Sequence, residues 1–95
     1  MSDLIDRLCS TPDERRLLQR EVTFMEATEL VCEVMQEEGV TLVELAKRTN
    51  INPDYLASAL DGELCISLVY LSDMLWAMGR GVKMMAEPLR KGRGR

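Results

Sequence analysis

The sequence contains no histidine, and only four of its 95 residues are aromatic. Histidine is the most common general base in enzymes and a frequent metal ligand, so its absence removes much of what a catalytic or metal site needs. We therefore expect no enzymatic activity, no cofactor and no metal. With so few aromatic rings, the core must consist mainly of Leu, Val, Ile, Met and Ala, which is typical of an all-α protein.

Cysteines and long apolar runs are also scarce. Cys9, Cys32 and Cys65 are odd in number, far apart and set in apolar segments, which favours reduced, buried thiols over a disulfide framework or a metal site. No apolar run approaches the roughly 18 residues that a membrane span needs. The first residues, MSDLIDRL, lack the basic and apolar stretches of a signal peptide. The sequence predicts a cytoplasmic protein with no membrane partner.

Charge is distributed unevenly along the chain. Residues 1–87 hold all 16 acidic residues and 8 of the 12 basic ones, which leaves this part at −8. The last eight residues, 88–95, have a charge of +4, and their basic residues alternate with glycine. The four basic residues are Arg90, Lys91, Arg93 and Arg95. Such a segment cannot form a packed element, so we expect a flexible basic tail, either a solvated terminus or an arm that binds phosphate groups.

The strongest signal for a helix start lies at Thr11. Thr11 can cap the helix, Pro12 fits the first helical position, and Glu14 stands where a capping box requires it. The spacing of apolar residues predicts an amphipathic helix up to Glu38, either unbroken or interrupted near residues 22–24, where three poor helix formers adjoin. With a short helix expected earlier in the chain, over residues 2–8, residues 1–22 form a predicted N-terminal helical extension. Its surplus apolar surface is a candidate dimer contact.

Two short helices and a tight turn are predicted next. Gly39 ends the long helix, and Thr41 with Glu44 forms a second capping box for a helix over residues 42–48. Asn50 is expected to adopt the left-handed backbone conformation in the turn that follows.

The remaining elements follow from similar signals. Asn52 caps and Pro53 begins the second short helix, which Gly62 ends. A further helix is predicted over residues 67–78, and residues 81–86 alternate too briefly to separate a short strand from an extended arm. Six apolar residues of the short helices are expected to pack on their neighbours, with Trp76 near the same seam: Leu42, Leu45, Ala46, Leu56, Ala59 and Leu60.

The stretch from Gly39 to Gly62 resembles, without a gap, the helix-turn-helix of the lambda-repressor-like, or Xre/Cro, superfamily. It shares with that family a Gly-apolar-Thr start, an apolar-Ala pair, an apolar turn residue and an aromatic-aliphatic pair. These are residues 39–41, Leu45-Ala46, Ile51 and Tyr55-Leu56. The resemblance covers about residues 23–85 and is strongest in small bacterial and phage regulators, including HigA-like antitoxins. It implies an all-α, compact bundle of about five helices with a central helix-turn-helix, in a domain over residues 23–87.

The resemblance also implies which residues read DNA bases. In this family the second short helix enters the major groove, and its early outward positions reach base edges. Those positions are Pro53, Asp54, Ala57 and Ser58, with Tyr55 near the rim. Pro53 and Ala57 have no side-chain hydrogen bond to offer, and the Asp54 carboxylate can only accept one. Base reading would therefore fall to Asp54, Tyr55 and Ser58, with DNA shape carrying part of the specificity.

The helix-turn-helix unit has little positive charge with which to bind phosphate groups, since residues 41–63 have a net charge of −2. Neutralisation of phosphates provides most nucleic-acid affinity. Five residues of the unit are expected to hold phosphate groups: Thr41, Lys47, Arg48, Asn50 and Asn52. Basic residues beyond the unit are expected to add positive charge: Arg80, Lys83, Arg90, Lys91 and Arg93.

Two functions remain open on the sequence alone. The first is a sequence-specific transcription regulator, such as a repressor, that binds double-stranded DNA as a homodimer and joins the nucleoid when bound. The second is a protein-interaction module of the same fold, with a toxin or another regulator as its partner. The acidic recognition unit and the long amphipathic segment favour the second function. The dependence of binding on salt distinguishes the two functions, because binding driven by phosphate contacts weakens steeply as ionic strength rises.

Overall fold

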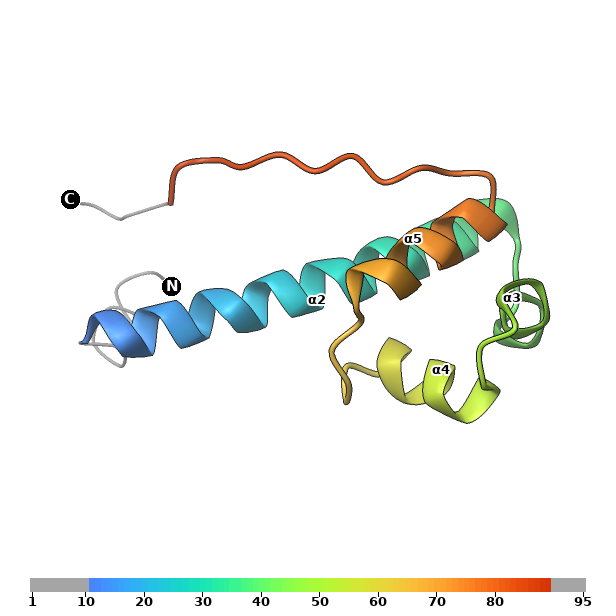
Figure 1. Cartoon of the computed structure of the whole chain (residues 1–95), viewed down its shortest axis with the longest axis horizontal. Helices are drawn as coiled ribbons and strands as arrows, with labels where there is room; N and C mark the ends of the chain where they lie inside the picture. Colours follow the sequence, from blue (N-terminus) through green and yellow to red (C-terminus); the bar gives the residue numbers. More distant parts are fainter. Residues whose placement is uncertain (1–10, 90–95) are drawn as a thin grey trace.

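The computed structural model describes residues 11–89 and contains four helices (Figure 1). In chain order they are α2 (Pro12–Glu38), α3 (Leu42–Thr49), α4 (Pro53–Leu60) and α5 (Leu68–Ala77). No strand occurs within residues 11–89, so the prediction of an all-α protein is confirmed. The helix expected over residues 2–8 lies outside the described residues.

Helix α2 is unbroken. The Thr11 hydroxyl accepts a hydrogen bond from the Glu14 backbone N–H at 3.1 Å, and the Glu14 carboxylate accepts one from the Thr11 N–H at 3.2 Å. This capping box satisfies two N–H groups that the first helical turn would otherwise leave unpaired. The helix passes through residues 22–24 without interruption and ends at Gly39, whose φ of 66° is the left-handed conformation that glycine adopts without strain.

The core forms where the second half of α2 meets the three shorter helices. Val31 of α2, Leu45 of α3, Leu56 of α4 and Met74 of α5 are each fully buried. Burying a side chain of this size contributes about 1.5–3 kcal/mol, so a few such residues hold the helices together. Leu42 and Leu60 pack against this core, as the apolar spacing predicts.

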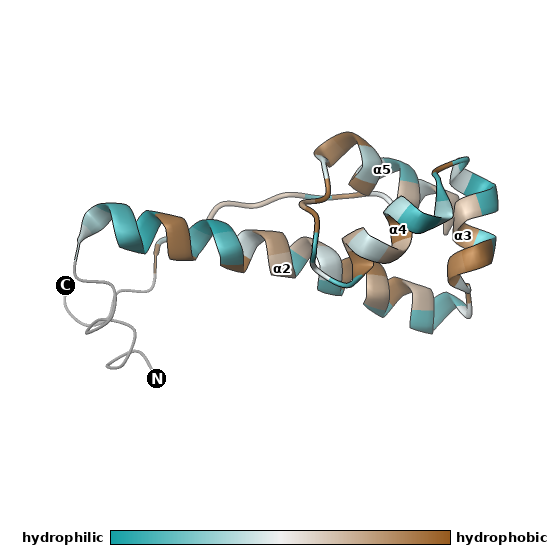
Figure 2. Ribbon diagram, turned by 90° about the horizontal axis from the view of Figure 1, so that it is seen from below, coloured by the Kyte–Doolittle hydropathy of each residue, from teal (hydrophilic) through white to brown (hydrophobic). Residues whose placement is uncertain are grey.

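The first half of α2 extends beyond this core (Figure 1). Val31 and Val34 are the only buried residues among those of α2. Several earlier apolar side chains face solvent, with Leu17 47% and Met25 58% exposed, and Phe24 is half-buried. Figure 2 shows the same contrast, since apolar residues gather where the four helices meet and polar residues dominate the projecting end of α2.

The expected position of Trp76 is wrong: its side chain is 78% exposed. Helix α5 turns one stripe toward the core, formed by Leu71, Met74, Leu75 and, just after the helix, Met78. A helix advances 100° per residue, so position 76 falls on the opposite face from this stripe.

After α5 the chain forms an extended arm over residues 80–89. Figure 1 shows it running back along α2, toward the N-terminal end of that helix. It has no strand partner in the described part of the chain, so the arm is correct and the short strand is not observed. Val82 alone among its residues packs against the core.

The prediction of buried thiols is wrong for the two cysteines that the structure describes. Cys32 and Cys65 are both free, but Cys32 is half-buried and Cys65 is exposed. Cys65 lies in the loop before α5, where its neighbour Ile66 takes the buried position instead. Cys9 falls outside the described residues. No helix in residues 11–89 is both long and apolar enough to cross a membrane.

Candidate nucleic-acid interface

The turn between α3 and α4 has the geometry that the sequence predicts. Asn50 has φ 60° and ψ 29°, and among residues 11–89 it is the only non-glycine residue with positive φ. Its backbone N–H donates to the Ala46 carbonyl at 2.8 Å, which closes α3. Asparagine tolerates this conformation better than most residues, so the chain reverses here without glycine.

Asn52 holds the start of α4. Its side-chain oxygen accepts hydrogen bonds from the Asp54 N–H at 2.8 Å and the Tyr55 N–H at 3.2 Å. The amide NH2 group of Asn52 makes no hydrogen bond to the described residues and remains available as a donor. Asn50, Asn52, Pro53 and Asp54 are all exposed, so three polar side chains face solvent at the start of α4 and in the turn before it.

The base-reading candidates further along α4 are less accessible. Ser58 and Ala57 are half-buried. The ring of Tyr55 packs edge-to-face against Tyr70 of α5, with centroids 5.3 Å apart and an angle of 77° between planes. Such a pair contributes about 0.5–1.5 kcal/mol. The Tyr55 ring therefore also joins α4 to α5, whatever its hydroxyl contacts.

The N-terminus of α3 carries a negative charge. The Glu44 carboxylate accepts hydrogen bonds from the Thr41 backbone N–H at 3.0 Å and from the Thr41 hydroxyl at 3.4 Å. The backbone hydrogen bond from Thr41, followed by the positive charge of Arg48, lowers the pKa of Glu44. Glu44 is thus ionised near neutral pH and opposes a phosphate group at the helix end where Thr41 was expected to bind one.

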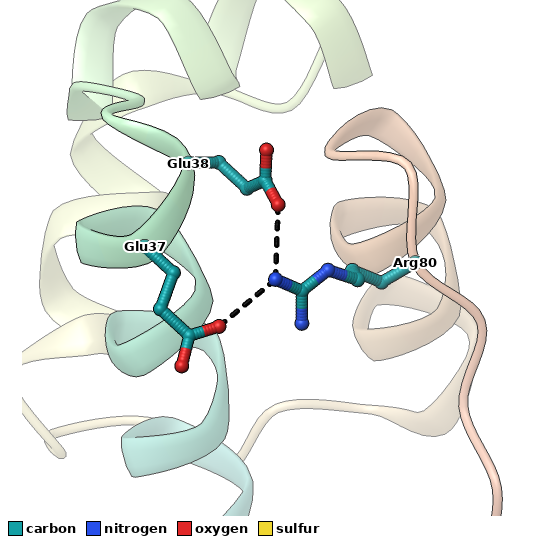
Figure 3. Close-up of polar contacts among 3 residues, drawn as sticks. All are labelled: Glu37, Glu38 and Arg80. Carbon is teal, nitrogen blue, oxygen red and sulfur yellow. Dashed lines mark hydrogen bonds and ion pairs between the residues drawn. The ribbon is translucent and has the colours of Figure 1, made fainter.

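Two arginines form hydrogen bonds or ion pairs with other residues of the chain. Arg48 donates from Nη1 to the Ala77 carbonyl at 3.1 Å, where it meets the partial negative charge at the C-terminus of α5. Figure 3 shows the second, Arg80, whose Nη2 lies 2.9 Å from one carboxylate oxygen of Glu37 and 2.9 Å from one of Glu38. These two hydrogen bonds raise the pKa of Arg80. Arg80 therefore does not supply the uncompensated positive charge expected of it.

Among the remaining cations, Lys47 and Lys83 are exposed and form no hydrogen bond or ion pair with residues 11–89. Lys47 stands in the last turn of α3, close in sequence to the α3–α4 turn. Arg90, Lys91 and Arg93, the predicted phosphate-binding residues of the tail, lie outside the described residues. The interface thus combines a polar helix start with little positive charge of its own.

Sequence reasoning did not find the groove between α2 and the α4–α5 connection. Its volume is about 320 Å³, and its lining includes Glu21, Glu29, Asp61 and Glu63. The acidic residues of the connection and those of α2 are visible in the sequence, but only the packing of α2 against α4 brings them to one place.

Comparisons with protein-family models, with curated proteins and with solved structures find no match to this chain. Within the described residues, no group of three or more histidine, cysteine or acidic side chains is arranged to hold a metal ion. The functional conclusion therefore rests on the geometry of the helices and on the chemistry of their surfaces.

Proposed function

We propose that this protein is a sequence-specific, double-stranded DNA-binding transcription regulator that acts as a homodimer. The observation that supports this proposal is the paired arrangement of α3 and α4. Leu56 and Ala59 hold α4 against the core, while the start of the same helix faces solvent. A short helix held in this way has the dimensions to enter the major groove of B-form DNA.

In this proposal the start of α4 reads bases. Asp54 accepts a hydrogen bond from an exposed base amino group such as that of cytosine, and the hydroxyls of Tyr55 and Ser58 act as donors or acceptors. Pro53, which offers no side-chain hydrogen bond, makes only van der Waals contact with the major groove of the DNA. Part of the specificity comes from DNA shape and deformability, because only three side chains offer hydrogen bonds.

Phosphate groups are held by the neighbouring turn and by the basic tail. Lys47, Asn50 and the amide of Asn52 border the start of α4, and Thr41 and Arg48 make smaller contributions because Glu44 and Ala77 already occupy them. The tail, with Arg90, Lys91 and Arg93, adds the positive charge that this unit lacks, so much of the affinity depends on residues 88–95.

The experiment that tests this function is selection of the purified full-length protein against a random double-stranded DNA library at moderate salt. A regulator that binds as a dimer is expected to enrich a two-fold symmetric site whose half-sites lie roughly 34 Å, or one helical turn, apart. Recovery of unenriched DNA, or of none, would contradict the proposal.

Three variants then test the residue assignments on the enriched site. Ser58→Ala and Tyr55→Phe each remove a hydroxyl, and Tyr55→Phe keeps the ring that packs on Tyr70. A Val43→Ala variant is the matched control, since Val43 is exposed on α3 and has no assigned contact. If both hydroxyl variants bound like the control, Tyr55 and Ser58 would not read bases.

A second function, a protein-interaction module with a toxin or another regulator as partner, is favoured by one set of observations. The helix-turn-helix has a net charge of −2 over residues 41–63, and Arg48 and Arg80 have partners within the fold. Trp76 and Val69 are exposed on α5, 78% and 67% respectively. Such a module would bind its partner with little dependence on salt, whereas DNA binding is expected to weaken steeply between low and moderate ionic strength.

A further inference from the structure

The groove between α2 and the α4–α5 connection has an apolar floor. Phe24 and Met25 line it from α2, and Leu60 and Leu64 line it from the other side. Met25 is 58% exposed and Leu64 is 41% exposed, so part of this apolar surface faces solvent. With a volume of about 320 Å³, the groove has room for one or two side chains of a bound peptide.

The rim of the groove is acidic. Glu21 and Glu29 stand on the α2 side, and Asp61 and Glu63 on the side of the connection, while no basic residue lines the groove. None of the four carboxylates forms an ion pair with another residue of the described chain. Four like charges around one opening repel each other, and a cationic occupant would remove that repulsion. We refer to this site as the acidic groove.

We propose that the acidic groove binds the basic tail, residues 88–95, of a second copy of this chain. The tail complements the groove in both chemistry and charge. Leu89, which is 68% exposed, offers an apolar side chain for the floor, and the four cations that follow it match the four carboxylates of the rim. Apolar contact fixes the position of the tail, and the charges add affinity and selectivity for a basic segment.

The course of the arm explains why the tail comes from a second copy. Figure 1 shows the arm on one side of α2 and the helix α4 on the other, and the arm runs past α4 toward the N-terminal end of α2. To enter its own groove the tail would have to pass around α2, a cylinder roughly 10–12 Å across, and turn back along its axis. A second chain meets no such constraint.

Two chains that each place their tail in the groove of the other form a symmetric pair in which both grooves are filled. This interaction goes beyond the proposed function and does not require DNA. The interaction affects the proposed function in one way. A tail bound in the acidic groove is not available to phosphate groups, so DNA and the acidic groove compete for the same cations.

Disulfide trapping in the full-length protein tests this interaction without DNA. Cys65 lines the groove and is exposed, so it reports a tail that comes near. The parent chain for the test carries Gly94→Cys, with Cys9→Ser and Cys32→Ser to remove the other thiols. Mild oxidation is expected to join Cys65 of one copy to position 94 of another, and mixing isotopically light and heavy chains before mass spectrometry shows whether the bond lies between copies.

A pair of charge reversals tests the contribution of the rim. Glu29→Lys with Glu63→Lys is expected to slow formation of this disulfide by at least about tenfold. The matched control is Glu26→Lys with Glu33→Lys, which makes the same change in charge at exposed α2 positions outside the groove and is expected to leave the rate within about twofold. Each rate is divided by the rate at which Cys65 reacts with an uncharged small disulfide, which corrects for thiol reactivity.

A tail variant keeps the test decisive if the groove variant does not fold. Arg90→Gln with Lys91→Gln leaves the helical core unchanged and is expected to slow the trapping, as is a rise in salt from about 50 to about 500 mM. A disulfide within one chain, a rate independent of salt and of the tail charges, or equal slowing by both reversal pairs would overturn the proposal.

Discussion

The two halves of α2 lie in one continuous helix and have different surroundings. The second half buries Val31 and Val34 against α3, α4 and α5, whereas the first half leaves Leu17 and Met25 in solvent. Both halves are helical, and the first begins with a complete capping box although it contains the poor helix formers at residues 22–24. The difference shows that local signals determine where a helix forms, while the long-range packing of the later helices determines which part of it is buried.

The largest effect is expected from truncating the core that the second half contacts. Leu56→Ala removes a fully buried side chain and leaves a cavity, so we expect a loss of about 2–5 kcal/mol in the free energy of unfolding. Leu17→Ala in the first half is the matched control, with an expected change of less than about 0.5 kcal/mol. Urea unfolding followed by circular dichroism measures both. Equal losses would show that the first half of α2 is packed as well as the second.

The two capping boxes offer the next comparison. Thr41→Ala removes the cap of α3, which belongs to the core, so we expect it to lower the free energy of unfolding by about 1 kcal/mol. Thr11→Ala removes the same contact at the free end of α2 and is expected to fray the first turn while changing global stability less. Urea unfolding measures stability, and amide hydrogen exchange near residues 12–16 measures fraying. A larger loss in the free energy of unfolding for Thr11→Ala than for Thr41→Ala would contradict this expectation.

The ion pairs of Arg80 connect the end of α2 to the arm, and a moderate effect is expected there. Arg80→Ala is expected to increase amide hydrogen exchange at position 80, whose backbone N–H donates to the Leu75 carbonyl at 2.8 Å, while leaving exchange near residues 12–20 unchanged, because Glu37 and Glu38 lie in the last turn of α2. Arg16→Ala is the control, since Arg16 forms an exposed ion pair within α2, at 3.7 Å from Asp13. Unchanged exchange in the arm would show that Arg80 does not hold it in place.

The smallest effect is expected from pH. Because the folded protein lowers the pKa of Glu44 below its ordinary value of 4.5, its contribution to stability is complete above that pH and is lost as the pH falls through the folded pKa. Glu44→Gln keeps a capping side chain without the charge. Thermal unfolding from pH 6 down to pH 3 is therefore expected to show a smaller fall in Tm for Glu44→Gln than for the natural chain. The same fall in both would exclude a role for this carboxylate in acid sensitivity.

Much of the fold could be predicted because its signals are local. The caps at Thr11, Thr41 and Asn52, the left-handed Asn50 and the apolar spacing of each helix all depend on residues within four positions of each other. The helix starts and most of the core residues followed from them.

The remaining features depend on contacts between residues far apart in the chain. Arg48 is 29 residues from Ala77, and Arg80 is 42 residues from Glu38. Periodicity does not reveal such pairs, so both arginines were expected to be available for phosphate. The exposure of Trp76 is a different case, because the spacing of Leu71, Met74 and Leu75 already places position 76 on the opposite face of α5, so helical periodicity alone could have predicted it.

The measurement that tests the central proposal most directly is a comparison of the DNA sites selected by the natural protein and by Asp54→Asn. Asp54 is exposed at the start of α4, and the change replaces an acceptor by an amide that also donates. If α4 reads bases, both proteins are expected to enrich sites with the same half-site spacing, and the preferred base is expected to change at one position in each half-site. Identical sites, or no enriched site for either protein, would contradict base reading by α4.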